Sequence, residues 1–303
     1  MFQSPISKRS LFFSALLSLI IIFLLFFQSW LNSFTTVVFC DVGQGDATYI
    51  RIKNRFDLLI DAGPGRKILD CLGKYMPFYD RTIELAVISH PQKDHFGGFL
   101  YILDRYDLKK IWMTQLYNPS QTFKQLLDKT KTKSITVEFP KAGEKFLIGQ
   151  AIVDFFWPSD SFILKNSFFD SYTQPPLRQT ALDLNNFSLI FSLQLTGKRI
   201  LFTGDTSPLV LSKLLNMPIG TQDQSKLKSE ILKIPHHGSK KGLSVEFLKL
   251  ADPIYGVISA GKNNSYGHPE KNILDMLEAQ GVKVRRTDLE GDIVFKIPSP
   301  NSQ

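Results

Sequence analysis

Short apolar runs separated by polar turns recur along the chain and predict a protein of many strands and several helices. Runs that predict strands occupy residues 35–39, 48–52, 57–60, 85–88 and 110–114 in the first half. The pattern returns at residues 187–195, 199–202, 231–234, 255–259, 283–287 and 292–297. Stretches with apolar residues at helical spacing lie between them, at residues 67–75, 99–106, 209–215, 245–250 and 272–280. This alternation is typical of an α/β fold.

The pattern is weaker in the middle of the chain. Residues 115–133 predict a loop and a lysine-rich helix, and residues 135–139 and 150–157 predict edge strands around a turn at residues 141–144. Residues 158–180 have no steady period and contain a pair of prolines. We expect them to form a loop that crosses between two halves of the fold.

The N-terminal residues differ from the rest because they are almost uniformly apolar. Residues 11–27 contain only two polar side chains, both serines, and as a helix they would span about 26 Å, close to a bilayer core. We expect residues 1–32 to form an uncleaved membrane anchor and residues 33–303 to form one extracytoplasmic domain, because Lys8 and Arg9 precede the apolar run. A signal peptide is the competing interpretation, although its apolar region is usually shorter.

Composition adds two constraints. A chain of 303 residues with 43% hydrophobic content can bury a large core, and its formal charge of +8 favours an anionic partner such as nucleic acid, a phosphate ester or an acidic lipid surface. Cys40 and Cys71 are too few for a disulfide framework and lack the spacing of metal ligands. We expect both to pack in the core, with a bridge left open if the domain lies outside the cytoplasm.

All five histidines lie in polar turns directly after predicted strands: His90, His95, His236, His237 and His268. Asp61, Asp94 and Asp205 occupy equivalent strand ends. If the strands concerned are parallel, these ends fall along one edge of a sheet, where open α/β sheets place their ligands. Imidazole and carboxylate groups without a nearby cysteine suit a divalent ion such as zinc or manganese, so the pattern predicts a hydrolytic metal centre.

The expected roles follow from these positions. One or two divalent ions, zinc or manganese, would be held by His90, Asp94, His95, Asp205 and His237. Asp205 would bridge two ions, unless it caps the helix that begins near Pro208. Asp61 would either lie behind a ligand histidine or fix its turn. Catalysis is assigned to Asp94, His236 and His268, and which of His236 and His237 faces the metal stays open.

Residues close to the histidines are expected to hold the substrate. They are Asp46, Ser239, Lys240, Asn264 and Tyr266. Backbone amides, a hydroxyl and an ammonium beside a metal suit a phosphate group. The alternative for Lys240 and Lys241 is a solvated lysine pair in a turn.

Taken together, these motifs resemble the metallo-β-lactamase superfamily, and within it the extracytoplasmic domain of ComEC-type DNA-internalisation (competence) proteins. The matching segments are residues 41–47, 59–63, 89–98, 185–189, 203–205, 236–239 and 265–269, in family order. The resemblance implies a four-layer αβ/βα sandwich with the metal site at the sheet edge. It also implies a phosphodiesterase that degrades the DNA strand that is not imported.

Two departures from the family pattern stand out. Gln92 occupies the second ligand position of the histidine motif, where an amide is a poorer ligand than histidine or aspartate. No histidine lies between His95 and Asp205, where β-lactamases supply another ligand, and Asn186 is expected nearby as a weak substitute. These departures argue against β-lactam hydrolysis.

The sequence therefore predicts a membrane-anchored, metal-dependent phosphodiesterase that acts on DNA or another phosphate ester. With a single membrane segment, the chain would not itself be the DNA channel, so a separate channel protein is an expected partner. Two alternatives stay open. One is a degenerate module that binds DNA or a channel subunit without turnover, as Gln92 suggests, and the other is a hydrolase of a small ester or lactone.

Overall fold

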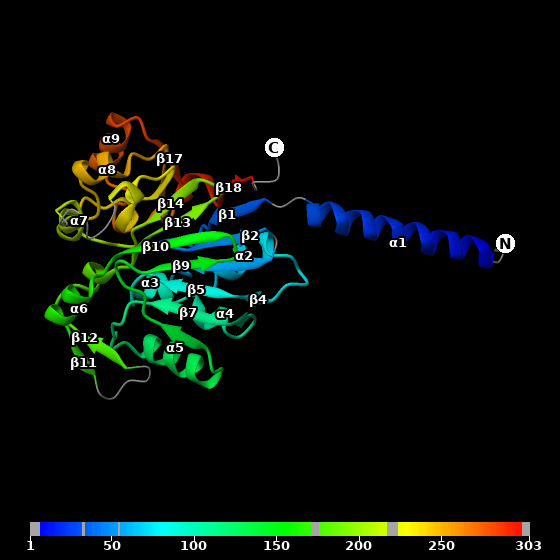
Figure 1. The fold of residues 1–303 in the computed structure, drawn as a ribbon, viewed down its shortest axis with the longest axis horizontal. Helices are drawn as coiled ribbons and strands as arrows, with labels where there is room; N and C mark the ends of the chain where they lie inside the picture. Colours follow the sequence, from blue (N-terminus) through cyan, green and yellow to red (C-terminus); the bar gives the residue numbers. More distant parts are fainter. Residues whose placement is uncertain (1–6, 32–33, 54, 171–175, 217–223, 299–303) are drawn as a thin grey trace.

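The computed structural model describes residues 7–31, 34–53, 55–170, 176–216 and 224–298. Two seven-stranded sheets form its centre (Figure 1). The first sheet has the strand order β18 (Ile293–Ile297), β1 (Thr35–Phe39), β2 (Thr48–Ile52), β3 (Phe56–Ile60), β5 (Leu85–Ile88), β7 (Lys110–Met113) and β8 (Thr136–Glu138). The second has the order β17 (Lys283–Arg286), β16 (Tyr255–Ile258), β15 (Ile231–Lys233), β14 (Lys198–Phe202), β13 (Ile190–Leu195), β10 (Ala151–Trp157) and β9 (Lys145–Ile148).

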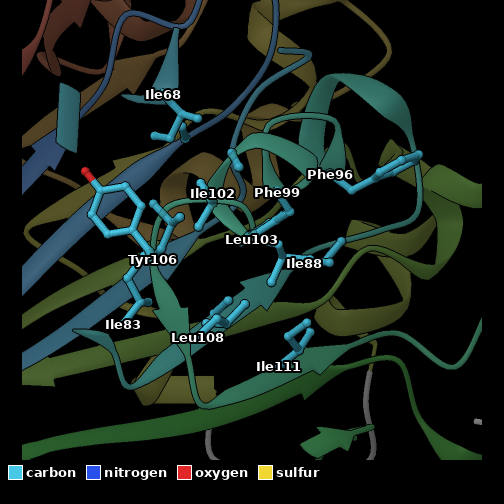
Figure 2. Packing of buried hydrophobic residues seen from close by; sticks show 14 of the residues in the cluster. Ile68, Ile83, Ile88, Phe96, Phe99, Ile102, Leu103, Tyr106, Leu108 and Ile111 are labelled. Atoms are coloured by element: carbon cyan, nitrogen blue, oxygen red, sulfur yellow. The ribbon is translucent and has the colours of Figure 1, made fainter. Parts of the chain in front are cut away.

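Three hydrophobic clusters show that the sheets and helices form four layers. The middle cluster lies between the sheets, where Phe39 of the first sheet stacks on Phe202 of the second. The first outer cluster packs α2 (Ile68–Tyr75), α4 (Phe99–Ile102) and α5 (Gln121–Thr132) on the first sheet, and Figure 2 shows part of it. The other packs α7 (Pro208–Leu215), α8 (Val245–Ala251) and α9 (Lys271–Ala279) on the second sheet. The predicted αβ/βα sandwich is confirmed.

Strand direction explains both the apolar runs and the place of the polar turns. β3, β5, β7 and β8 are parallel neighbours, as are β14, β15, β16 and β17. Helices cover such strands on one face and the opposite sheet covers the other, so all four residues of β5 are buried. Because the parallel strands of a sheet end at the same edge, the polar turns that follow them gather there.

The prediction for residues 158–180 was wrong. This part of the chain contains α6 (Asp160–Asn166), β11 (Phe168–Asp170) and β12 (Leu177–Gln179), while residues 171–175 lie outside the described residues. The Ser159 side chain accepts a hydrogen bond from the backbone amide of Phe162, which caps α6. These elements are too short for a periodic pattern to reveal them.

Two other expectations about strands also need correction. β9 was missed, and it takes the edge of the second sheet, so β10 is an interior strand paired with both β9 and β13. The predicted strand at residues 187–195 begins only at Ile190, because η1 (Leu184–Phe187) forms a 3₁₀ turn before it. The remaining short elements are β4 (Thr82–Ile83), α3 (Lys93–Phe96), β6 (Asp107–Leu108), η2 (Gln224–Leu227), η3 (Pro235–Gly238) and α10 (Thr287–Glu290).

The N-terminal helix α1 (Lys8–Leu31) extends away from the sandwich (Figure 1). Among the residues that the structure describes, no helix is both long enough and apolar enough to cross a membrane. Both cysteines are buried in the core as expected, and Cys40, after β1, and Cys71, in α2, form a disulfide bond. The sequence alone left this bridge open.

Candidate metal centre

Four of the predicted ligands converge where parallel strands of the two sheets end. Asp94 and His95 lie in α3 after β5, Asp205 follows β14, and His237 lies in η3 after β15. One ligand atom from each of the four lies within 4.8 Å of all the others. Asp205 stands between the histidines, with Oδ1 3.3 Å from His95 Nε2 and Oδ2 3.3 Å from His237 Nε2. The separation between His237 Nε2 and Asp94 Oδ2 is 3.4 Å.

These residues fit a divalent cation. His95 Nε2, His237 Nε2 and Asp205 Oδ1 are buried, yet within the described part of the chain none of them makes a hydrogen bond of good geometry. Buried polar atoms are rarely left without a partner, because the loss of hydration costs about 1 to 3 kcal/mol for each group. Two imidazole nitrogens and two carboxylates are a ligand set that suits zinc or manganese.

The first of the two histidines, His95, is held from behind by Asp61. The Nδ1 atom of His95 lies 2.8 Å from Asp61 Oδ2. The backbone amide and hydroxyl of Ser89 also donate to the Asp61 carboxylate, at 2.8 and 2.7 Å. A carboxylate at Nδ1 keeps the proton there and leaves Nε2 free to bind a metal. The structure thus places Asp61 behind a ligand histidine, one of its two expected roles.

The second histidine, His237, is supported by different groups. Its Nδ1 lies 3.0 Å from the carbonyl oxygen of Ser259 and 3.3 Å from Asp46 Oδ1. Asp46 in turn forms a 2.7 Å ion pair with Lys233, and both side chains are buried. Asp46 was predicted to hold substrate, but it lies behind His237, where burial closes it to solvent.

Backbone conformation determines which residue of the histidine pair points inward. His236 and His237 both adopt left-handed φ angles, +52° and +54°, which are unusual for residues other than glycine. This turn buries His237 beside Asp205 and leaves His236 partly exposed. Strain of this kind is typical of functional sites. The structure therefore favours His237 as the ligand, a choice that the sequence left open.

Close packing of glycines against the loop that carries the ligands keeps it compact. A side chain at Gly45 would come within 2.3 Å of the Asp94 carbonyl oxygen, and one at Gly98 would come within 2.0 Å of the Ala62 carbonyl oxygen. Only glycine fits at such distances. The glycine-rich turn at residues 43–45 and the glycine pair after His95 thus have a packing role.

The ionisable groups of the candidate centre shift one another's pKa values. Burial acts to lower the pKa values of His95 and His237, but Asp205 and the other nearby carboxylates raise both well above the usual range. Burial acts to raise the pKa of Asp205, but the two histidines hold it well below its usual value. Asp205 is therefore ionised and ready to bind a cation.

His90 stands apart from this group. It is fully buried, its Nε2 has no hydrogen-bond partner among the described residues, and its ring lies 4.1 Å from that of His95. Burial, assisted by His95, lowers its pKa to about 3, so the ring is neutral. The described residues contain one other group of possible ligand atoms, from Asp46, Asp61 and His95, and neither group contains His90 or Gln92. The structure thus brings together four of the five predicted ligands. His90, the fifth, lies beside them but outside the group.

The other predicted site residues lie around the rim. The rings of His236 and His268 are 6.0 Å apart, and Tyr266, which is 69% exposed, stacks on His268. Asn264 donates to the carbonyl oxygens of Gly261 and His268 and accepts from the His268 amide, so it shapes this loop. Burial, with the other two histidines, lowers the pKa of His268.

Two expected phosphate contacts are occupied by Glu270, which the sequence did not single out. The Lys240 backbone amide donates to the Glu270 carboxylate at 3.0 Å, and the Lys240 ammonium lies 3.4 Å from it. Ser239 is buried, and its hydroxyl also reaches Glu270. Asn186 lies elsewhere, because its Oδ1 accepts a hydrogen bond from the Ser207 hydroxyl at 2.7 Å.

Sequence reasoning also missed Lys233, Ser89 and Ser259, which support the ligands. Lys233 had a signal, since it is a charged residue at the end of an apolar strand and so needs a buried partner. Ser89 also had a signal, because it directly precedes His90 within the histidine motif. Ser259 acts through its backbone carbonyl, which no side-chain pattern reveals.

Comparison with known proteins agrees with this architecture. The family model of the metallo-beta-lactamase superfamily matches residues 40–262, so the chain belongs to the metallo-β-lactamase superfamily. It is 24% identical over 299 residues to ComE operon protein 3 of Bacillus subtilis (strain 168), covering 91% of this chain and 35% of that protein. It is 27% identical over 259 residues to competence protein ComA of Neisseria gonorrhoeae, covering 84% and 31%.

These relatives confirm the resemblance to competence proteins of the ComEC type, and the chain spans about a third of the length of each. Among solved structures, the metallo-beta-lactamase fold protein YhfI of Bacillus subtilis matches with a TM-score of 0.53 at 12% identity, covering 87% of this chain and 99% of that one. Igni18, a metallo hydrolase from Ignicoccus hospitalis, matches with a TM-score of 0.52 at 16% identity, covering 86% of this chain and 99% of that one. At these identities the likeness shows the fold.

Proposed function

We propose that the chain is a metal-dependent phosphodiesterase that acts on DNA. The observation that carries the proposal is the group of Asp94, His95, Asp205 and His237, in which one ligand atom of each lies within 4.8 Å of the others. Three of the buried atoms in this group, His95 Nε2, His237 Nε2 and Asp205 Oδ1, lack hydrogen-bond partners among the described residues. Such a group is costly unless a cation completes it. Membership of a superfamily of hydrolases and similarity to competence proteins support a hydrolytic role in DNA uptake.

Residues of the chain would take separate roles in phosphodiester hydrolysis. A bound divalent ion lowers the pKa of water and neutralises charge on a phosphate. The Asp94 side chain is 32% exposed, against 2% for Asp205, so it is the ligand that solvent reaches. Asp94 would accept the proton of the attacking water, and His236 or His268 at the rim would donate to the leaving oxygen or hold the phosphate.

The proposal includes a location outside the cytoplasm. Residues 11–27 would anchor the chain in the membrane, and the positive residues before them would stay on the cytoplasmic side. The disulfide between Cys40 and Cys71 supports an oxidising compartment. A separate membrane channel that takes up the other DNA strand is the proposed partner.

The test is the metal content and nuclease activity of the full chain beside Asp205→Ala. The proposal expects the wild type to retain a divalent ion and to cleave DNA, and the variant to lose both. An Asp205→Ala variant that still cleaves DNA would contradict the assignment of the metal centre.

A second candidate function rests on His90, which is buried but belongs to no group of metal-ligand atoms among the described residues. With Gln92 in place of a better ligand, the domain could keep its fold and bind DNA or a channel subunit without turnover. This alternative predicts a metal-free protein that binds DNA with a steep dependence on salt. The metal content of the purified chain distinguishes the two functions, because only the hydrolase is expected to retain a divalent ion.

A further inference from the structure

A cavity of about 770 Å³ lies between α6 and α7, outside the metal-ligand group. Both helices lie on the side of the molecule that faces away from α1 (Figure 1). Trp157 and Phe162 form part of its lining, with ring centroids 4.5 Å apart. Leu182 and Leu209 also line it, although 42% and 60% of their surfaces are exposed. Exposed apolar side chains gathered in a concave site are typical of ligand-binding grooves.

The cavity also carries positive charge. Lys165 of α6 and Lys213 of α7 line it, and no acidic residue does. Within the described part of the chain, no carboxylate lies at ion-pair distance from either lysine. Nearby lysines are different, because Lys141 pairs with Asp160 and Lys226 pairs with Asp154. The two cavity lysines are therefore available to an anionic ligand.

A short segment joins the cavity to the metal centre. Ser207 and Leu209 follow Asp205 by two and four residues, so the Cα atoms of Asp205 and Leu209 are at most about 14 Å apart. Asn186 fixes this segment to the cavity wall, because its Oδ1 accepts from the Ser207 hydroxyl and its backbone oxygen accepts from Trp157 Nε1. Asn186, expected at the metal, thus lies in the wall of the cavity instead.

We infer that this cavity binds a nucleotide of single-stranded DNA that flanks the bond to be cleaved; this inference rests on the proposed function. The base would lie against Phe162 and the two leucines, and the flanking phosphates would face Lys165 and Lys213. Apolar and aromatic surfaces with interleaved cations are how proteins bind single strands without reading their sequence. The short distance to Asp205 allows one strand to occupy the cavity and the metal centre together.

The experiment measures binding of a nuclease-resistant phosphorothioate oligothymidylate to the full chain in EDTA, by fluorescence anisotropy over a series of salt concentrations. The Lys165→Ala/Lys213→Ala double variant should bind on the order of tenfold more weakly, and its salt slope should fall by about 1.4, since each contact with a single strand contributes about 0.7. Leu209→Asp, at an exposed position, should also weaken binding. Lys249→Ala, in the last turn of α8 and outside the cavity, is the matched control and should change neither quantity.

Hydrolysis of bis(p-nitrophenyl) phosphate by the metal-loaded variants shows whether the metal centre is intact, because this small ester does not extend into the cavity. Unchanged hydrolysis with weakened oligonucleotide binding supports the inference. Unchanged oligonucleotide binding in both cavity variants overturns it. A metal-loaded wild type that binds the oligonucleotide through these lysines but hydrolyses neither bis(p-nitrophenyl) phosphate nor an unmodified oligothymidylate contradicts the proposed function and leaves single-strand binding in the cavity standing.

Discussion

The two sides of the metal centre differ in completeness. On one side Asp94, His95, Asp205 and His237 converge within 4.8 Å, and both histidines have a carboxylate behind them. On the other side His90 is buried beside Gln92, without a hydrogen-bond partner for its Nε2 among the described residues. The difference favours a single cation site, on the side of the four converging ligands. A single ion can still activate water and stabilise a phosphate, so the difference does not exclude catalysis.

The largest effect should come from removing a ligand on the complete side. His237→Ala should lower metal affinity by more than about a hundredfold, because even the loss of a partner behind a ligand costs 10- to 100-fold. His90→Ala is the matched control, and its metal affinity should stay within a few-fold of the wild type. Isothermal titration with zinc or manganese measures both. Equal losses in the two variants would show that the sides do not differ.

The disulfide is expected to stabilise the fold that holds the four converging ligands, although neither cysteine is a ligand. Cys40 lies just before the turn that carries Asp46, and its bond to Cys71 spans 31 residues of sequence. Closing a loop of that length contributes about 3 to 4 kcal/mol to the free energy of unfolding. Urea unfolding with and without reducing agent measures this loss. The Cys40→Ala/Cys71→Ala variant is the control, since a reducing agent should not change its stability.

The carboxylates behind the two histidines offer a finer comparison. Asp61→Asn and Asp46→Asn should each lower metal affinity by about 10- to 100-fold. Only Asp46→Asn should also lower stability, by about 3 to 5 kcal/mol, because it leaves the buried Lys233 ammonium unpaired. Adding Lys233→Met should restore much of that stability without restoring metal affinity. Equal stability of Asp46→Asn and wild type would contradict the role given to this ion pair.

The smallest effect is expected at Gln92. Gln92→His should change the affinity for the first ion by less than about threefold, which is below 1 kcal/mol. It should add weak binding of a second ion, because it places another imidazole near His90. Metal titration followed by elemental analysis reports both quantities. A large change in the first ion's affinity would place Gln92 within the complete site.

Much of this arrangement could be predicted from the sequence because it depends on strand ends. Apolar runs marked the interior strands, and parallel pairing brought Asp61 and His95 to the edge of the first sheet and Asp205 and His237 to the edge of the second. What could not be predicted depends on contacts between distant residues. The contact of Asp46 with Lys233 and that of Lys240 with Glu270 join segments whose approach no local pattern specifies. The short elements α6, β11 and β12 escaped notice because each covers at most two helical turns or three residues.

One ion, held by Asp94, His95, Asp205 and His237, is proposed to support phosphodiester hydrolysis. The most direct measurement titrates the metal-free full chain with zinc or manganese and follows both bound ion and hydrolysis of bis(p-nitrophenyl) phosphate. We expect one tightly bound ion per chain to produce the full rate, and His90→Ala to behave in the same way. Two tightly bound ions, a rate that rises only with the second, or a loaded protein without hydrolysis would contradict it.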